Sequence, residues 1–310
     1  MKETHVVLGA NGGVGKQLIK VLQSAGKDYR AVARSLDPTD KRNLRANLLN
    51  LTEAQHAFKG AHTAYLCVGL PYDLKAWKSQ WPLLIKNVLQ AAEENGCQLL
   101  FLDNVYMYGP APLQRPFDER HSLLPASEKG KVRKQIAELV MEAHESGRVR
   151  TMIARAADFL GPDATNSIFY IAFLQNMLKG KSPQLFFPVS VPHTFANTKD
   201  IAQAMMQLAM APDCYGQVWH LPVGDAITIG DMGSLFNQAL ERMDAIREMP
   251  RWLQKTLGLF IRPLRELEEM CYQFEHPYLM SWKKFQTRFP DFQRTDYPDV
   301  VKEMVASFKA

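Results

Sequence analysis

The chain contains only four cysteines, Cys67, Cys97, Cys214 and Cys271, and they stand far apart. No C-x-x-C pair occurs, so the spacing typical of a zinc site or a dithiol redox site is absent. Long apolar runs are missing as well, because the longest one near the C-terminus, residues 256–261, is far too short to cross a bilayer. We therefore expect reduced thiols, no bound metal and no membrane partner.

Neither sign of charge dominates the chain. The 37 lysines and arginines and the 32 aspartates and glutamates give a net charge of +5, and the basic residues form no continuous stripe. This excess does not indicate a nucleic-acid partner and suits a small anionic ligand as well as anything. A strand pattern begins within a few residues of the N-terminus, whereas a secretory signal would have a basic segment followed by a longer apolar one. We expect a cytoplasmic protein, and a homodimer is compatible with these properties.

The order of apolar segments predicts the fold class. The 310 residues, 46% hydrophobic and 22% charged, suit a globular protein with one large domain or two unequal ones. We expect strands at 5–8, 29–33, 46–49, 64–68, 98–102, 149–154 and 218–221. We expect helices at 16–24, 52–58, 76–95, 127–146, 165–179 and 200–210. This alternation predicts an α/β fold with a doubly wound parallel sheet.

The second half of the chain loses this regular alternation. We expect residues 1–230 to form the core around the sheet, with 162–195 contributing to a second lobe. Residues 231–310 are rich in methionine, aromatic residues and charge, and their pattern is mostly helical. Because ligands of such sheets lie beyond the carboxyl ends of the strands, we expect 231–310 to form a C-terminal lobe over that edge, at the substrate.

Residues 9–15, with the sequence GANGGVG, lie between the first expected strand and the first expected helix. A strand, a glycine-rich turn and a helix in this order form a cradle for the phosphates of a dinucleotide. Gly9 permits a tight turn, Gly12 lets the backbone approach a pyrophosphate, and Gly15 lets the helix pack on the strand. The helix N-terminus adds free amide donors and a positive dipole end. The other turn residues expected at the cofactor are Asn11, Gly13 and Val14. The motif thus predicts an NAD(P)-binding Rossmann fold.

The end of the second strand indicates which dinucleotide binds. Many NAD sites carry an acidic residue there for the ribose diol, but this chain has Arg34. A guanidinium can pair with a 2′-phosphate through two hydrogen bonds, so we expect NADP, with NAD as the alternative. Asn47 and Leu48 end the third strand and are expected at the adenine. Val68 and Gly69 end the fourth strand and are expected beside the nicotinamide ribose.

Four segments carry a resemblance to a known superfamily. The glycine turn matches G-x-x-G-x-x-G, and Met107-Tyr108-Gly109 resembles a V-Y-G motif after the fifth strand. Residues 155–162 resemble the R-x-x-x-x-x-G-P segment of epimerases, and residues 197–201 resemble their segment near the substrate. Over roughly residues 1–230 the chain resembles the short-chain dehydrogenase/reductase superfamily, in its extended and atypical branches of NAD-dependent epimerases/dehydratases and NmrA-like proteins. The resemblance implies an oxidoreductase, epimerase or isomerase acting on a small carbonyl or hydroxyl substrate.

The resemblance also implies where the acid–base residues fall. Members of the superfamily use a serine or threonine after the fifth strand and Y-x-x-x-K on the next helix, whose tyrosine exchanges a proton with the substrate. Alignment on Gly109 puts Asn104 at the serine, Lys129 at the tyrosine and Arg133 at the lysine. All three residue types are therefore changed.

Two interpretations remain open at this point. In the first, the chemistry is rebuilt: the like charge of Arg133 and partial burial activate Lys129, Asn104 polarises a carbonyl, and Tyr106 or Tyr108 replaces the missing phenol. In the second, the site binds NADP without turnover, and the protein is a regulator or redox sensor, as NmrA-like members are.

Other polar residues are expected to be structural. Asp200 is expected to cap the N-terminus of a helix. The histidines that have no partner at metal-ligand spacing are His121, His144, His193 and His220.

Overall fold

The computed structural model describes residues 3–309 and contains a central sheet of seven parallel strands. Their order across the sheet is β11-β6-β5-β4-β1-β2-β3. The strands are β1 (His5–Leu8), β2 (Tyr29–Ala33), β3 (Asn43–Arg45), β4 (Thr63–Leu66), β5 (Gln98–Asp103), β6 (Thr151–Arg155) and β11 (Val218–His220). The winding direction reverses between β1 and β4, which creates a crevice beyond the carboxyl ends of these strands. The predicted doubly wound parallel sheet is confirmed.

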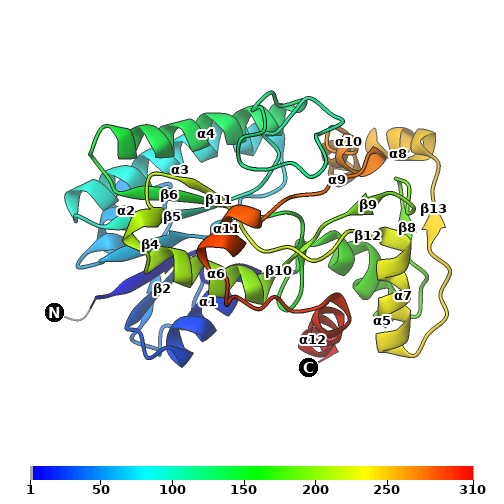
Figure 1. Cartoon of the computed structure of the whole chain (residues 1–310), viewed down its shortest axis with the longest axis horizontal. Helices are drawn as coiled ribbons and strands as arrows, with labels where there is room; N and C mark the ends of the chain where they lie inside the picture. Colours follow the sequence, from blue (N-terminus) through cyan, green and yellow to red (C-terminus); the bar gives the residue numbers. More distant parts are fainter. Residues whose placement is uncertain (1–2, 310) are drawn as a thin grey trace.

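Helices cover both faces of the sheet (Figure 1). One face packs against α2 (Leu51–Phe58), α3 (Leu74–Glu94) and α4 (Glu128–Glu145). The other packs against α1 (Gly13–Ser24), α6 (Thr198–Ala209) and α11 (Lys283–Arg288). Because helices cover both faces of the sheet, every residue of β1, β4 and β6 is buried, which explains why most of their residues are apolar.

Most predicted elements of the sheet and its covering helices are confirmed within a few residues, and two other elements differ from the prediction. The strand expected at 46–49 lies earlier, at β3, because the side chain of Asn47 accepts a hydrogen bond from the Leu49 amide and starts a turn before α2. The helix expected at 165–179 begins later. It consists of a π-helical segment, η1 (Phe169–Leu174), continued by α5 (Gln175–Leu178), because residues 163–167 form successive turns.

The C-terminal part lies beside one end of the sheet (Figure 1). Residues of η1 pack in one apolar cluster with α7 (Ile229–Leu240) and α12 (Tyr297–Lys309), whereas Phe285 of α11 packs in the cluster under the sheet. The remaining helices are α8 (Arg251–Gly258), α9 (Arg262–Glu268), α10 (Tyr272–Glu275) and the short η2 (Pro212–Cys214). Three small sheets pair β7 (Phe159–Leu160) with β10 (Ala196–Asn197), β8 (Gln184–Leu185) with β13 (Arg247–Glu248), and β9 (Pro192–His193) with β12 (Ile227–Thr228).

Two further properties hold for residues 3–309. None of the helices there combines the length and the apolar character that crossing a membrane requires. Histidine, cysteine and acidic side chains do not gather there in a group of three or more that could hold a metal ion.

Candidate functional site

The turn between β1 and α1 has the backbone geometry for which its glycines were predicted. Gly9 has φ +90°, and a Cβ atom on it would lie 2.8 Å from the backbone of Cys67 and Val68, at the end of β4. A Cβ atom on Gly15 would overlap the carbonyl oxygen of Gly9. Both positions therefore require glycine, the first for its conformation and the second for the close approach of helix and strand.

The N-terminus of α1 is open to an anion. Gly12 is the N-cap residue, no side chain caps this end, and the first turn carries no acidic residue. Asn11 and Gly12 are exposed and Gly13 is partly exposed, so the helix begins at the protein surface. On one flank the carbonyl oxygen of Asp163 would lie 2.8 Å from a Cβ atom on Gly13. Exposed amide donors at a positive helix end fit a phosphate group.

The end of β2 carries an arginine without an acidic competitor. Arg34 is exposed, and its guanidinium group makes no hydrogen bond or ion pair within the described residues. The nearest carboxylate that follows, Asp37, accepts hydrogen bonds from the amide and hydroxyl groups of Thr39, at 2.9 and 2.8 Å. The side chain of Asn11 donates a hydrogen bond to the carbonyl oxygen of Ser35, which ties this strand end to the glycine turn.

The residues expected at the adenine and the nicotinamide ribose lie at the ends of their strands with mixed exposure. Asn47 is exposed and its side-chain oxygen accepts a hydrogen bond from the Leu49 amide, while Leu48 is buried in the core. Val68 is partly buried, and Gly69 is exposed with open space around it. Their contacts with a cofactor stay a prediction.

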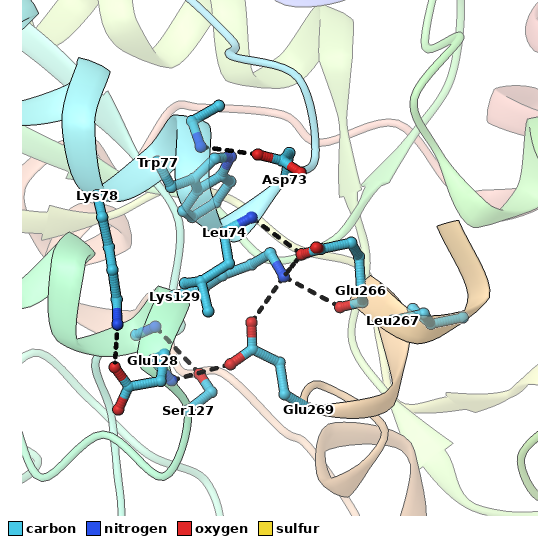
Figure 2. A network of polar contacts seen from close by, with 12 residues as sticks. Asp73, Leu74, Trp77, Lys78, Ser127, Glu128, Lys129, Glu266, Leu267 and Glu269 are labelled. Atoms are coloured by element: carbon cyan, nitrogen blue, oxygen red, sulfur yellow. Dashed lines mark hydrogen bonds and ion pairs between the residues drawn. The ribbon is translucent and has the colours of Figure 1, made fainter. Parts of the chain in front are cut away.

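Lys129 is fully buried and holds the C-terminal part of the chain (Figure 2). Its ammonium group lies 2.6 Å from a carboxylate oxygen of Glu266 and 2.6 Å from one of Glu269. The same carboxylates accept hydrogen bonds from the first amides of α3 and α4, those of Leu74 and Glu128, both at 2.9 Å. The two glutamates therefore cap two helices and neutralise the lysine at once.

Arg133 lies one helical turn further along α4 and is also buried in an ion pair. Its guanidinium donates two hydrogen bonds to Asp103, the last residue of β5, and lies 4.5 Å from the ring of Trp81. Arg155 contacts the other oxygen of Asp103 at 3.4 Å. The sequence correctly placed Lys129 and Arg133 on one helix face. The expectation that Arg133 acts on Lys129 as an uncompensated like charge finds no support, because carboxylates pair with both cations.

The hydroxyl group of Tyr108 is engaged with two buried partners in a chain of hydrogen bonds. The guanidinium of Arg155 donates to the Tyr108 oxygen at 2.7 Å, and the hydroxyl lies 2.6 Å from Nε2 of His220. Nδ1 of His220 in turn donates to the carbonyl oxygen of Ser281 at 2.9 Å. Burial raises the pKa of Tyr108 to about 12 and lowers that of His220 to about 3. These contacts favour a structural role for Tyr108.

Asn104 and Tyr106 follow β5 and are both partly buried. The side-chain oxygen of Asn104 accepts a hydrogen bond from the Tyr106 amide at 3.1 Å, so it shapes the turn. The Tyr106 ring stacks on Trp77 with its centroid 6.2 Å away. Burial, and then the charge of Asp158, raises the pKa of Tyr106 well above its ordinary value. The sequence-based interpretation needed a cation that would keep this phenol acidic, and the effect of Arg133 is too small to do so.

Asp158 is a candidate site residue that the sequence analysis passed over. It follows the carboxyl end of β6, inside the segment 155–162 that carries the resemblance, and burial raises its pKa to about 6. An acidic residue just after a parallel strand, in a segment already recognised, was the signal that could have identified it.

Two expectations about structural residues have different outcomes. The N-cap of α6 is Asn197 rather than Asp200, so that prediction is wrong. Asp200 lies in the first turn, buried, and accepts hydrogen bonds from the amide and hydroxyl of Thr295, which fastens the segment before α12. His193, like His220, uses both ring nitrogens on backbone carbonyl groups or buried partners, which agrees with a structural role.

Known structures share this architecture. WbmH from Bordetella bronchiseptica, crystallised with NAD+, superposes with a TM-score of 0.77 at 17% identity, covering 100% of this chain and 99% of that chain. UDP-glucuronic acid 4-epimerase from Bacillus cereus, crystallised with NAD, gives 0.79 at 15% identity, with coverages of 99% and 98%. The dTDP-glucose 4,6-dehydratase DesIV from Streptomyces venezuelae, crystallised with NAD and TYD, gives 0.80 at 13% identity, with coverages of 99% and 97%. Identities this low show a common fold.

Similarity in sequence is more specific than similarity in fold. No curated protein matches the chain. A model of the NAD dependent epimerase/dehydratase family matches residues 5–222, which run from the start of β1 to just beyond the end of β11. Because that match spans most of the sequence, this chain belongs to the NAD dependent epimerase/dehydratase family.

Proposed function

We propose that this chain binds a nicotinamide dinucleotide, with NADP preferred to NAD, and acts as an oxidoreductase or epimerase on a small carbonyl or hydroxyl substrate. The observation that carries the proposal is the glycine turn, whose exposed helix N-terminus offers unshielded amide donors beside two positions that tolerate only glycine. The solved structures of similar fold, crystallised with NAD, support a dinucleotide at this place.

Arg34 supports the preference for NADP. Its guanidinium is exposed at the end of β2 and unpaired among the described residues, so a 2′-phosphate can reach it without displacing another contact. The ribose diol of NAD, in contrast, has no acidic acceptor there, since the carboxylate of Asp37 is engaged with Thr39.

The substrate belongs to a broad class. Similar structures are of enzymes that act on nucleotide-linked sugars, which makes a sugar-nucleotide epimerase the second enzyme candidate. The superfamily's tyrosine is replaced by Lys129 here, and Lys129 is held in ion pairs, so proton transfer must use another group.

We also propose that residues 1–230 form the nucleotide-binding core, that 231–310 form the substrate lobe, and that the four free cysteines reflect a reducing cytoplasm.

A non-catalytic regulator is the alternative from a different class. It is favoured by one observation: Lys129 and Arg133, at the positions of the superfamily's tyrosine and lysine, are both consumed by structural ion pairs. Such a protein would bind NADP(H) and change its interactions without transferring a hydride.

Two measurements test the proposal. NADPH fluorescence is titrated with the parent protein and with Gly12→Val, whose branched side chain would occupy the place of the pyrophosphate. The matched control is Gly230→Ala, in α7, where a Cβ atom would meet no atom closer than 3.5 Å. Binding by the parent and control but not by Gly12→Val supports the cradle, and equal affinities of all three contradict it. A panel of aldehydes, ketones and alcohols, followed by cofactor absorbance, then separates an enzyme from a regulator.

A further inference from the structure

Three buried cations near the crevice are paired with carboxylates, whereas one carboxylate there, that of Asp158, has no cation as its partner within residues 3–309. Lys129 is neutralised by two glutamates, while Arg133 and Arg155 share Asp103. Within residues 3–309, Asp158 takes part in no ion pair and its carboxylate accepts no side-chain or backbone hydrogen bond, and the residue is only partly buried. A partly buried carboxyl group without protein partners is free to contact a ligand.

The loops that surround Asp158 leave the carboxyl ends of three neighbouring strands. Tyr72 follows β4, Tyr106 follows β5 and Asp158 follows β6, and these strands are adjacent and parallel. All three side chains therefore lie at one edge of the sheet, where ligands of such folds bind. Burial, and then the charge of Asp158, raises the pKa of Tyr106.

A second unpartnered group comes from the C-terminal part. The hydroxyl of Tyr272, in α10, is buried and has no hydrogen-bond partner among the described residues. Its pKa is raised to about 12, chiefly by burial, with contributions from Glu269 and Asp158. The neighbouring Tyr278 is different, because its hydroxyl donates to the carbonyl oxygen of Val105 at 3.0 Å. Asp158 and Tyr272 thus present polar atoms that the protein itself leaves unused.

The carboxyl group of Asp158 and the neighbouring phenols differ in their protonation near neutral pH. Burial raises the pKa of Asp158 to about 6, so its protonated and ionised forms are both populated near neutral pH. The phenols of Tyr72, Tyr106, Tyr272 and Tyr278 keep their protons throughout that range, because their pKa values are raised. The hydroxyl of Tyr272, unpartnered among the described residues, can donate a hydrogen bond to a substrate, whereas the carboxyl group of Asp158 can exchange a proton with it.

We propose that the carboxyl group of Asp158 exchanges the proton with the carbonyl or hydroxyl oxygen of the substrate, in the role that the superfamily gives to its tyrosine. This inference rests on the proposed function. In a reduction, the carbonyl carbon accepts a hydride from NADPH, which leaves as NADP+, and the oxygen accepts the proton of Asp158. The product is an alcohol, and the carboxylate regains a proton from water. Oxidation of an alcohol follows the same path in reverse.

The test uses the full chain, with Asp158→Asn as the variant of nearly equal shape and Asp158→Glu as the conservative variant. Asp299→Asn, an exposed aspartate of α12 paired with Lys302, is the matched control. We expect Asp158→Asn to keep its affinity for NADPH and its unfolding midpoint, while kcat on an active aldehyde or ketone falls by about 100-fold or more. Asp158→Glu should recover part of this loss, and Asp299→Asn should match the parent.

The pH profile gives an independent readout. Carbonyl reduction by the parent needs protonated Asp158 and should decline above a pH of about 6, whereas alcohol oxidation needs the carboxylate and should decline below it. Asp158→Asn should lose this inflection. Infrared difference spectra between acid and neutral pH should contain a carboxyl band with the same midpoint, absent from Asp158→Asn, whether or not a substrate is present.

Three outcomes would overturn the proposal. The first is an Asp158→Asn variant with the kcat and pH profile of the parent. The second is NADPH binding by the parent with no turnover of any panel member, which would leave cofactor binding intact and favour the regulator. The third is the absence of NADPH binding, which would remove the proposed function itself.

Discussion

Lys129 and Glu266 form a buried ion pair at 2.6 Å although 137 residues separate them in the sequence. The lysine is the second residue of α4 and the glutamate belongs to α9, so the pair fastens the C-terminal part to the edge of the sheet. Lys129, which alignment on Gly109 puts at the superfamily's tyrosine, is therefore a structural anchor in this chain.

Replacing this lysine should destabilise the protein. In Lys129→Met, two carboxylates lose their cation in a buried place, and breaking such a pair costs about 3–5 kcal/mol. The measurement is the free energy of unfolding from guanidinium denaturation. Lys131→Met is the control, because Lys131 lies on the same helix but its ion pair with Glu128 is exposed and should contribute less than about 1 kcal/mol. Equal losses in the two variants would show that Lys129 is no anchor.

His220 should make the stability depend on pH. Its folded-state pKa is about 3, because of burial, against an ordinary 6.5. Between these values the unfolded chain binds a proton that the folded chain does not. The contribution of His220 is therefore complete above pH 6.5 and is lost as the pH falls below it.

Denaturation at about pH 7 and pH 5 measures this effect. The parent should lose more free energy of unfolding between the two conditions than His220→Gln, which cannot take up the proton. The variant should also be less stable than the parent at pH 7, because the buried contact with Tyr108 is altered. An identical pH dependence of both proteins would contradict a buried neutral histidine.

The glycines of the turn should separate folding from binding. A Cβ atom on Gly15 overlaps the backbone of Gly9, so Gly15→Ala should lower the free energy of unfolding by about 1–3 kcal/mol. On Gly12 the nearest atom would lie at 3.3 Å, and φ is −73°, so Gly12→Ala should fold with a smaller loss. Thermal unfolding of both variants measures the difference, and a larger loss for Gly12→Ala would be inconsistent with this geometry.

The first half of the fold could be predicted because its information is local. Strands such as β1 and β2 are short apolar segments bounded by turn residues, and the glycine turn has a spacing that few other structures need. The error at β3 has a local cause too, because the polar turn at Asn47 competes with a strand whose side chains are only partly buried.

The candidate site could be predicted only in part. The sequence put Lys129 and Arg133 on one face of α4, but it gave no sign of the glutamates that α9 brings back to them. Ion pairs between distant segments leave no periodic pattern, and the same lysine would look identical at an exposed position. The engagement of Tyr108 with His220, 112 residues later, was hidden for the same reason.

The last prediction concerns the cofactor itself. Losing a charged, hydrogen-bonded contact costs about 1.5–3 kcal/mol, so Arg34→Ala should weaken NADP binding by about ten-fold or more. Binding of NAD, which lacks the 2′-phosphate, should be nearly unchanged. Arg148→Ala, at an exposed site paired with Glu93, is the control and should leave both affinities as they are.

Isothermal titration of the parent protein and these two variants with NADP+ and NAD+ tests the central claim most directly. The account predicts that the parent binds both dinucleotides, NADP+ more tightly, and that Arg34→Ala removes most of this difference. Tighter binding of NAD+ by the parent would contradict the role of Arg34, and binding of neither dinucleotide would contradict the assignment of the glycine turn.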